Sequence, residues 1–357
     1  MQKGWAPAHA AGAQGIRALR RSFFLALCLT AAVATAQTPE PTLARRDAAA
    51  WLGKIHRAAQ RENYVGTLIY QRGSVMHASR IQHFSDLVHN EYERLETLDG
   101  KPREVLRQND IVHSLIPEAK LVVVERQDAK DRFPALLATN KGDVLDLYEM
   151  RRLSPERVAG MECEVFSLVP HDGARYAVRL WAEKHSGLLM RAQTIGEGGK
   201  VLEQVAFSQI EIGVPSEKQK ILGAIKSAAN WQRYEINYQP ANIAEEGWLI
   251  TVPIKGFQKI REVRRPLGDL RSAQGSGREQ VFEVLQVVYS DGLTGLSVFI
   301  EPVSEQRVRR EGVASLGATQ VVVRKVADFW ITVVGEVPAA TVKQFAAAVE
   351  YRAPKPR

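Results

Sequence analysis

The stretch that decides the fold class is residues 163–212, CEVFSLVPHDGARYAVRLWAEKHSGLLMRAQTIGEGGKVLEQVAFSQIEI. It alternates four strand-like segments with three short turns and leaves no room for a helix. The turns are His171-Asp172-Gly173, Ser186-Gly187 and Gly196-Glu197-Gly198-Gly199, and each supplies a glycine where a hairpin needs a positive φ. Consecutive hairpins form an antiparallel meander. Such a sheet can bury one face and leave the other to a helix, a partner or an apolar ligand.

The second strand of this meander separates two kinds of side chain. Tyr176, Val178 and Leu180 share one face, because successive side chains in a strand point to opposite sides. The other face carries Arg175 and Trp181 and is amphipathic. The pattern leaves open whether that second face is exposed.

The segment before the meander is also rich in predicted strands. Residues 47–60 show helical spacing and predict an amphipathic helix that Asp47 caps. Residues 64–71 are apolar on both faces, with Tyr64, Leu68 and Tyr70 on one of them. Such a strand is either covered on both sides or faces an apolar cavity on one side. Further strands are predicted at residues 75–83, 89–97, 104–108, 111–116 and 121–126. The alternation breaks at residues 128–155, where we expect short helices or an ordered loop at 134–138 and 143–150.

The segment after the meander predicts a second domain. Residues 215–231 have apolar side chains at helical spacing and predict a linking helix. A final helix is expected at residues 339–351. Between them, strands are predicted at residues 248–253, 258–264, 280–289, 295–301, 319–326 and 329–334. This order favours a smaller α+β domain.

The first 36 residues have the pattern of a secretory signal peptide. Basic residues precede an apolar core at residues 22–33, and a small-residue motif ends at Ala36, after which we expect cleavage. The core is too short to span a membrane. Cys28 does not fit a lipid attachment site, because Leu27 precedes it where a small residue is expected.

Removal of this leader changes both the charge and the cysteine count. The leader carries four basic and no acidic residues, so the formal net charge falls from +8 to +4. That excess is too small to indicate nucleic-acid binding. Cys163 then remains without a disulfide partner in the chain, and we interpret it as a small buried strand residue rather than a reactive thiol.

No catalytic or cofactor motif stands out in the chain. It lacks a G-x-S-x-G elbow, a phosphate-binding loop and an H-E-x-x-H pair. His77, His83 and His89 recur every six residues, but strand geometry does not bring three such positions together around a metal. Glu91 and Glu93 lie among arginines and favour a paired strand surface over acid/base catalysis. We therefore predict no enzyme activity, no cofactor and no metal.

Basic residues concentrate in one later segment. Residues 255–278 hold seven basic side chains against two acidic ones, and Arg307, Arg309 and Arg310 add a second run. Such a run is typical of a solvated loop. It also suits an anionic partner, either an acidic peptide or lipid phosphates, which guanidinium groups bind in bidentate fashion.

Short motifs in a fixed order carry a family resemblance. In the first half they are Trp51-Leu52, Asn63-Tyr64, Arg152-Leu153-Ser154-Pro155, Cys163-Glu164-Val165, Asp172-Gly173, Arg175-Tyr176, Trp181, Leu189-Met190-Arg191 and Leu202-Glu203-Gln204. In the second half they are Arg264-Arg265-Pro266-Leu267, Tyr289-Ser290-Asp291-Gly292-Leu293 and Ile331-Thr332-Val333-Val334-Gly335-Glu336. In this combination the chain resembles the MucB/RseB family of periplasmic sigma-E regulators.

The resemblance implies an α+β protein with two domains. The first would be like the lipoprotein carriers, an open antiparallel β half-barrel with helices on its concave face. The second would be a smaller α+β domain. We expect a signal peptide at 1–36, a disordered tail at 37–46, the N-terminal domain at 47–214, a linker helix at 215–233 and the C-terminal domain at 234–353.

The resemblance also implies a function. The protein would bind the periplasmic segment of a transmembrane anti-sigma factor, protect it from regulated proteolysis, and so restrain the envelope-stress sigma factor until lipid or lipopolysaccharide releases it. We expect lipid contacts at Tyr64, Leu68, Tyr70, Tyr176, Val178 and Leu180. We expect partner contacts at Arg264, Arg265, Tyr289, Asp291, Gly292 and Leu293.

Alternatives stay open at this level. A packed core explains the doubly apolar strands as well as a lipid cavity does. A periplasmic lipid or lipoprotein carrier is the second hypothesis, and an enzyme built on the three histidines is the third. Homo-oligomerisation is also open, because a sheet edge looks the same in the sequence whether it is paired or not.

Overall fold

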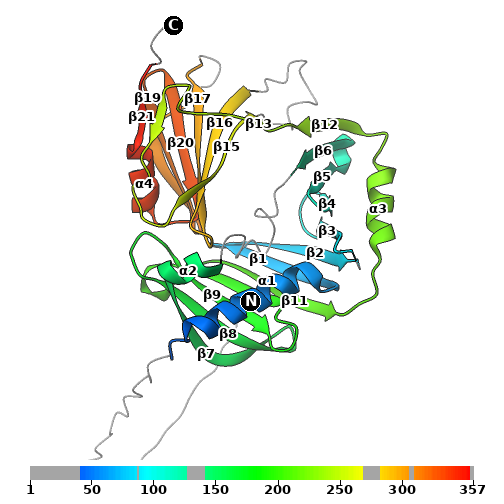
Figure 1. Ribbon diagram of the computed structural model, residues 1–357. Helices are drawn as coiled ribbons and strands as arrows, with labels where there is room; N and C mark the ends of the chain where they lie inside the picture. Colours follow the sequence, from blue (N-terminus) through cyan, green and yellow to red (C-terminus); the bar gives the residue numbers. More distant parts are fainter. Residues whose placement is uncertain (1–40, 87, 127–140, 268–281, 305–308, 354–357) are drawn as a thin grey trace, which may run out of the picture. The chain divides into compact units, whose positions relative to one another are not determined.

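The computed structural model describes residues 41–86, 88–126, 141–267, 282–304 and 309–353. Contacts group Glu40–Arg357 into one unit, and every helix and strand described below belongs to it. Most of its strands form two large, mainly antiparallel sheets (Figure 1). Among the described residues, no helix is both long and apolar enough to cross a membrane.

The larger sheet has twelve strands in the order β12-β6-β5-β4-β3-β2-β1-β11-β10-β9-β8-β7. Neighbours in the chain are mostly neighbours in the sheet, because tight turns make hairpins. The strands are β1 (Tyr64–Arg72), β2 (Val75–Ser85), β3 (Glu91–Thr97), β4 (Glu104–Gln108), β5 (Ile111–Ile116), β6 (Leu121–Arg126), β7 (Tyr148–Val158), β8 (Met161–Pro170), β9 (Ala177–Glu183), β10 (Leu189–Ile195), β11 (Val201–Ile212) and β12 (Gln232–Ile236). The predicted meander is confirmed as β8 to β11, and the long-range pairing of β1 with β11 joins it to the strands before it. Short 3₁₀ turns lie at Pro117–Ala119 and Glu197–Gly199.

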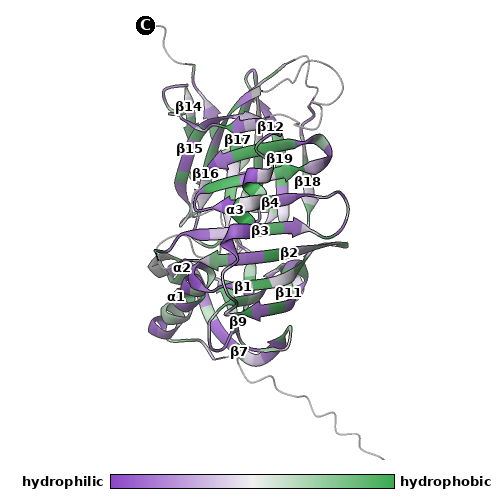
Figure 2. Ribbon diagram, turned by 90° about the vertical axis from the view of Figure 1, so that its right-hand side faces the viewer, coloured by the Kyte–Doolittle hydropathy of each residue, from purple (hydrophilic) through white to green (hydrophobic). Residues whose placement is uncertain are grey.

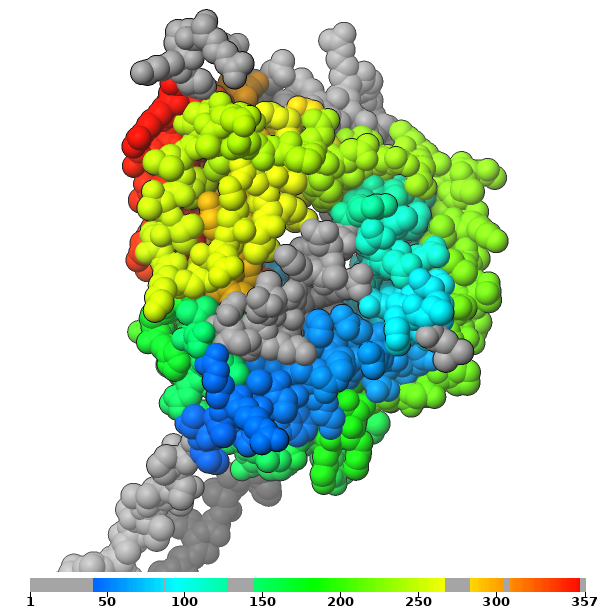
Figure 3. All heavy atoms as spheres, viewed as in Figure 1, coloured from blue at the N-terminus to red at the C-terminus, as the bar shows by residue number. Residues whose placement is uncertain are grey.

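Two helices cover one face of this sheet. Helix α1 (Arg45–Arg61) buries Leu52 and Ile55 against Leu180, and Val144 of α2 (Lys141–Leu147) joins the same cluster. The outer side of α1 lies at the molecular surface (Figure 3). Asp47 lies in the first turn of α1, where its charge favours the helix N-terminus, but the N-cap is Ala44 and not Asp47 as predicted.

A third helix covers the opposite face at the other end of the sheet. Cross-strand pairing places Tyr64, His83, Glu93 and Arg107 on the face that α1 covers. Leu106 therefore points the other way, and it packs with Ile221 of α3 (Lys218–Ser227). The predicted linking helix is thus part of the fold, and after it β12 adds to the sheet in parallel with β6.

Three expectations for the N-terminal part were wrong. The short helix or loop expected at 143–150 is matched by α2 only up to Leu147, and β7 starts at Tyr148 where no strand was expected. The expected tail is shorter than residues 37–46, because Thr42 pairs with Arg151 and α1 begins at Arg45. The segment expected as a linker to residue 233 ends in a sheet strand, β12. The predicted helix at 134–138 lies outside the described residues.

The second sheet has seven strands in the order β13-β15-β16-β17-β20-β19-β18. Their bounds are β13 (Gln239–Pro240), β15 (Gln258–Leu267), β16 (Phe282–Ser290), β17 (Gly295–Pro302), β18 (Gly312–Leu316), β19 (Thr319–Val326) and β20 (Phe329–Gly335). Hydrophobic residues alternate with hydrophilic ones along many strands of both sheets, which is the pattern that covers one face (Figure 2).

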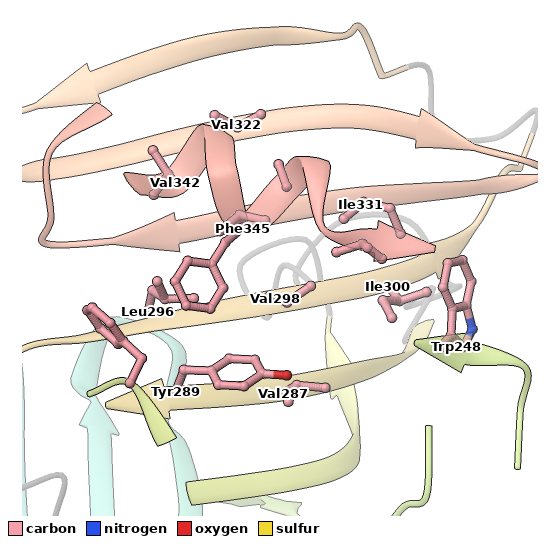
Figure 4. Packing of buried hydrophobic residues seen from close by; sticks show 14 of the residues in the cluster. Trp248, Val287, Tyr289, Leu296, Val298, Ile300, Val322, Ile331, Val342 and Phe345 are labelled. Atoms are coloured by element: carbon pink, nitrogen blue, oxygen red, sulfur yellow. The ribbon is translucent and has the colours of Figure 1, made fainter. Parts of the chain in front are cut away.

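Helix α4 (Ala339–Ala347) covers one face of the second sheet. Val342 and Phe345 are fully buried against Leu296 and Val298 of β17 (Figure 4). The Phe345 ring lies 5.3 Å from that of Tyr289 on β16. The predicted last helix ends at Ala347, and a short strand, β21 (Val349–Tyr351), follows it and pairs with β14 (Trp248–Ile250).

Candidate functional site

Five of the six residues expected to contact lipid share one face of the larger sheet, and the sixth, Tyr176, lies just before β9. Leu180 pairs with Ala192, Ala192 with Val205, and Val205 with Tyr70. Alternation along β1 and β9 then places Tyr64, Leu68 and Val178 on the same face. The structure therefore brings together two groups that lie more than 100 positions apart in the sequence. Whether they bind lipid stays a prediction.

The apolar part of this face is filled by the chain itself. Leu180 is fully buried and Val178 nearly so, and both pack in one cluster with α1 and α2. Tyr64 and Leu68 pack in a second cluster with Ala58 of α1. An acyl chain that entered along this face would therefore have to displace α1.

Tyr64 is held from two sides in this cluster. Its ring stacks on His83 at 5.1 Å and meets Phe207 edge-on at 5.8 Å. Burial, followed by the charge of Glu93, raises the pKa of its hydroxyl well above the ordinary range. Tyr64 thus has the environment of a core residue.

The two other tyrosines among the expected lipid contacts, Tyr70 and Tyr176, make polar contacts. Tyr70 donates a hydrogen bond to Glu203 (3.0 Å) and accepts one from Arg72 Nε (2.7 Å). Burial, reinforced by the Glu203 carboxylate, raises the pKa of Tyr70 to about 12. Tyr176 lies 3.5 Å from the side-chain amide of Gln320 on β19. Glu203 also accepts the backbone N–H of Ala318, so this end of the face contacts the second sheet.

A buried charged group lies farther along the same face. Arg107 donates to Glu93 (2.6 Å) and Glu91 (3.3 Å), and its side chain is only 7% exposed. The predicted pairing of these carboxylates with arginine is confirmed. The paired charges offset the desolvation that each would otherwise suffer.

The three histidines are not brought together. His83 Nδ1 donates to the carbonyl oxygen of Glu62 (2.8 Å), whereas His77, near the exposed start of β2, lies 3.3 Å from Asp99. His89 occupies a turn with φ of 62°. Among the described residues, no three side chains of the kinds that bind metal form a group that could hold an ion.

The two arginines expected to contact a partner lie on β15. Arg264 donates to Glu246 (2.7 Å), and Arg265 stacks over the ring of Tyr238 at 5.2 Å. Both side chains are half-buried. The basic residues 271, 278 and 307 lie outside the described part of the chain.

The four other expected partner residues belong to the hairpin between β16 and β17, and they are buried. Tyr289 lies in the hydrophobic core that α4 covers. Burial and, to a smaller extent, the negative charge of Glu262 raise the pKa of its hydroxyl to about 12. Asp291, Gly292 and Leu293 are also buried. Leu293 packs in the cluster of α1 and α2. In this state the hairpin is an internal contact between the two sheets, and its role toward a partner stays a prediction.

Arg175 also takes part in this contact between the two sheets. The sequence did not predict this role for Arg175. Its Nε donates to Asp291 (2.6 Å), its Nη2 donates to the carbonyl oxygen of Lys255 (2.6 Å), and its Nη1 pairs with Asp172. Tyr148 donates to the same oxygen of Asp291 (2.9 Å). The alternation of side chains in the sequence left open whether Arg175 was exposed. The structure shows that Arg175 is buried.

Two models of known protein-family domains match the chain. The model of the MucB/RseB N-terminal domain matches residues 47–225, and that of the MucB/RseB C-terminal domain matches residues 242–350. The chain belongs to the MucB/RseB family. The family resemblance seen in the sequence is thus confirmed, as is the expected fold of an open antiparallel sheet with a smaller α+β part.

Curated MucB/RseB relatives align over most of the chain. The sigma factor AlgU regulatory protein MucB of Pseudomonas aeruginosa is 28% identical over 327 residues, which cover 88% of this chain and 94% of the relative. The sigma-E factor regulatory protein RseB of Escherichia coli is 27% identical over 308 residues, which cover 85% of this chain and 91% of the relative.

Two solved MucB structures have the same fold. The complex of Pseudomonas aeruginosa MucA and MucB is 26% identical and superposes with a TM-score of 0.65, covering 86% of this chain and all of the other. MucB in complex with MucA(peri) is 25% identical, with a TM-score of 0.63 and the same coverage. Both were solved with MucA bound.

Proposed function

We propose that this chain is an exported regulator that binds the periplasmic segment of a transmembrane anti-sigma factor. The observation that carries the proposal is the match to both MucB/RseB domains, together with MucA-bound structures that share this fold over 86% of the chain. The signal-peptide pattern supports export, with cleavage after Ala36. The mass of the protein recovered from the periplasm tests that position.

The partner-binding surface in this proposal includes β15. Arg264 and Arg265 are half-buried, so their stems are fixed while part of each guanidinium group is open to a carboxylate. Asp291, Gly292 and Leu293 act indirectly, because they hold the hairpin next to β16 from inside. Binding would protect the anti-sigma factor by keeping its segment from the extended form that proteases require.

A binding and protection assay tests this role. The full chain is titrated with the periplasmic segment of the anti-sigma factor from the same organism, and cleavage by the cognate protease is followed with and without lipopolysaccharide. We expect a complex at micromolar concentrations, slower cleavage in the complex, and faster cleavage again after lipopolysaccharide is added. The absence of a complex at tens of micromolar would overturn the proposal.

Charge reversal tests the surface. The double variant Arg264→Glu/Arg265→Glu should weaken binding about tenfold or more, because it replaces attraction by repulsion at the interface. Arg46→Glu, on the exposed side of α1, is the matched control and should leave binding unchanged. If both variants bind as well as the parent chain, β15 is not the binding surface.

Lipid carriage is the second candidate, and the apolar face shared by β1 and β9 favours it. In this proposal α1 moves away from Leu180 and Val178 to admit an acyl chain. Native mass spectrometry of the delipidated chain, titrated with phospholipid and then with lipopolysaccharide, measures uptake. Persistent absence of bound lipid would leave a packed core as the explanation.

A further inference from the structure

Helix α1 carries the whole excess of positive charge in the chain that follows the leader. Its residues 45–61 hold five basic side chains and one acidic side chain, which gives α1 a formal net charge of +4. The chain without residues 1–36 also has a formal net charge of +4, so the residues outside α1 balance to zero. A charge excess confined to one element indicates an anionic partner at that element.

Three of these basic side chains form a strip along one side of α1. Arg46, Arg57 and Arg61 are separated by eleven and four residues, which correspond to about three turns and one turn of a helix. All three are exposed, while Leu52 and Ile55 on the opposite side are buried. Within the part of the chain that the structure describes, none of the three pairs with an acidic side chain. We call them the arginine strip, and its ends are roughly 22 Å apart along the helix axis.

The two other basic side chains of α1 anchor the helix to its neighbours. Arg45 pairs with Asp146 of α2 over 2.7 Å. The Nζ of Lys54 donates to the carbonyl oxygen of Lys184 (2.7 Å) and lies 4.8 Å from the ring centre of Trp51. The helix therefore presents the arginine strip from a fixed position at the molecular surface (Figure 3).

We propose that the arginine strip docks this protein on the surface of an anionic phospholipid bilayer. Guanidinium groups bind phosphate oxygens in bidentate fashion, and three of them on one side of a straight helix reach headgroups in one plane together. A basic amphipathic helix is typical of such a contact. Because the apolar side of α1 is buried in the protein, the contact is electrostatic and no side chain enters the hydrocarbon.

A bilayer surface fits this strip better than a protein partner does. Protein interfaces are centred on aromatic and aliphatic side chains that leave water, and charged side chains are depleted at those centres. The exposed residue that lies between the arginines on this side of α1 is Ala50, which is too small to act as an anchor. A charged strip without an anchor suits a surface of many equivalent phosphates, where affinity does not require complementary shape.

Docking would also bring the chain close to its partner. The anti-sigma factor in the proposed function spans the membrane, so docking would confine both proteins to one surface and raise their effective concentration. This consequence rests on the proposed function, whereas the docking itself does not.

Co-sedimentation with vesicles tests the docking. The chain without residues 1–36 is used, which keeps the whole folded unit and leaves out the basic leader. We expect it to sediment with phosphatidylcholine vesicles that contain phosphatidylglycerol at about 0.02 M salt, and to stay in solution at about 0.5 M, because salt screens surface charges. The proposal is overturned by an absence of binding at low salt, by equal binding to pure phosphatidylcholine, or by binding that survives the high salt.

Charge-neutralising variants locate the contact. Arg57→Gln/Arg61→Gln should weaken vesicle binding roughly twentyfold, since each basic side chain near an anionic surface contributes about fivefold. Arg57→Lys/Arg61→Lys should retain most of the binding. The matched control is Arg264→Gln/Arg265→Gln, which removes the same charge from β15 and should bind vesicles like the parent chain. Equal losses in the two glutamine variants would show that only net charge matters, and would overturn the proposal.

Titration with the periplasmic segment of the anti-sigma factor, without lipid, separates docking from partner binding. Arg57→Gln/Arg61→Gln should bind the segment as well as the parent chain does. A loss of segment binding in this variant would show that the arginine strip contacts the partner, and would overturn docking on lipid. A parent chain that binds anionic vesicles but no segment would support docking and count against the proposed function alone.

Discussion

The Nε of Arg175 donates a hydrogen bond to Oδ2 of Asp291 over 2.6 Å, and neither side chain is exposed to solvent. The two residues are 116 positions apart in the chain. The other carboxylate oxygen of Asp291 accepts the N–H groups of Leu293 and Thr294, so it also stabilises its own turn. One carboxylate thus shapes the β16–β17 hairpin and attaches it to the larger sheet.

Removing one partner of this ion pair should be costly. Asp291→Ala should lower the free energy of unfolding by about 3–5 kcal/mol, because it leaves the buried Arg175 with only the partly exposed Asp172 as its counter-charge. Adding Arg175→Met should recover part of the loss, and urea unfolding of the four chains in a double-mutant cycle measures the coupling. The exposed pair Glu350–Arg352 is the control, and Glu350→Ala should cost about 1 kcal/mol or less. Equal losses in the two alanine variants would contradict the prediction.

Gly317 should tolerate alanine less well than Gly100, although both have positive φ, of +60° and +68°. A Cβ at Gly317 would lie 2.6 Å from Arg72 Cγ and 2.7 Å from a carboxylate oxygen of Glu203, whereas nothing lies within 4 Å of one at Gly100. Gly100→Ala should cost about 1–2 kcal/mol for the backbone alone. Gly317→Ala should cost more, since Arg72 and Glu203 must also move. Thermal unfolding measures both, and equal shifts in Tm would disprove a close contact at Gly317.

Leu180→Ala distinguishes a packed inner face from an open cavity. Leu180 is fully buried against α1, so the variant should lose about 2–5 kcal/mol of stability. Leu249→Ala, at a side chain that is 42% exposed, is the control and should lose much less. Chemical denaturation in lipid-free buffer measures the difference. A loss at Leu180 as small as that at Leu249 would indicate that the face is open.

Asp86 should make stability depend on pH in the acid range. Hydrogen bonds from the backbone and side chain of Asn90, with further ones from Lys218 and Val88, lower the pKa of Asp86 from 3.8 to about 2. Since the folded pKa is the lower one, this stabilisation is complete above the unfolded value and is lost as the pH falls from about 4 to 2. The stability difference between the parent chain and Asp86→Asn should therefore shrink over that range in urea titrations. Lys218→Met should keep most of the pH dependence, because the Asn90 bonds remain.

Elements with strong local signals were predicted well. The bounds of β4, β5, β6 and β19 agree with the predicted ranges, because each is a short run of strand-forming residues between turns. The missed strands lack that pattern. The second half of β7 is largely exposed and contains Pro155, and β18 is exposed throughout, so neither carries a sustained apolar alternation.

The candidate site likewise has one part that the sequence pattern predicted and one part that it did not. The shared face of Tyr64, Leu68 and Leu180 follows from alternation once β1 pairs with β11, and only the pairing itself needed the structure. The burial of Asp291 and Leu293 had no local signal. A Ser-Asp-Gly turn is typically exposed, and here it is covered because Arg175 and the α1 cluster lie against it.

The sequence alone determined the meander, the main helices and the family, since hairpins and amphipathic helices depend on residues that are close in the chain. Only the tertiary structure decided which faces α1 and α3 cover, that Arg175 meets Asp291, and that β18 is left as an open edge. Those outcomes depend on pairings between distant residues. Such pairings arise from the packing of the whole chain, and no local pattern encodes them.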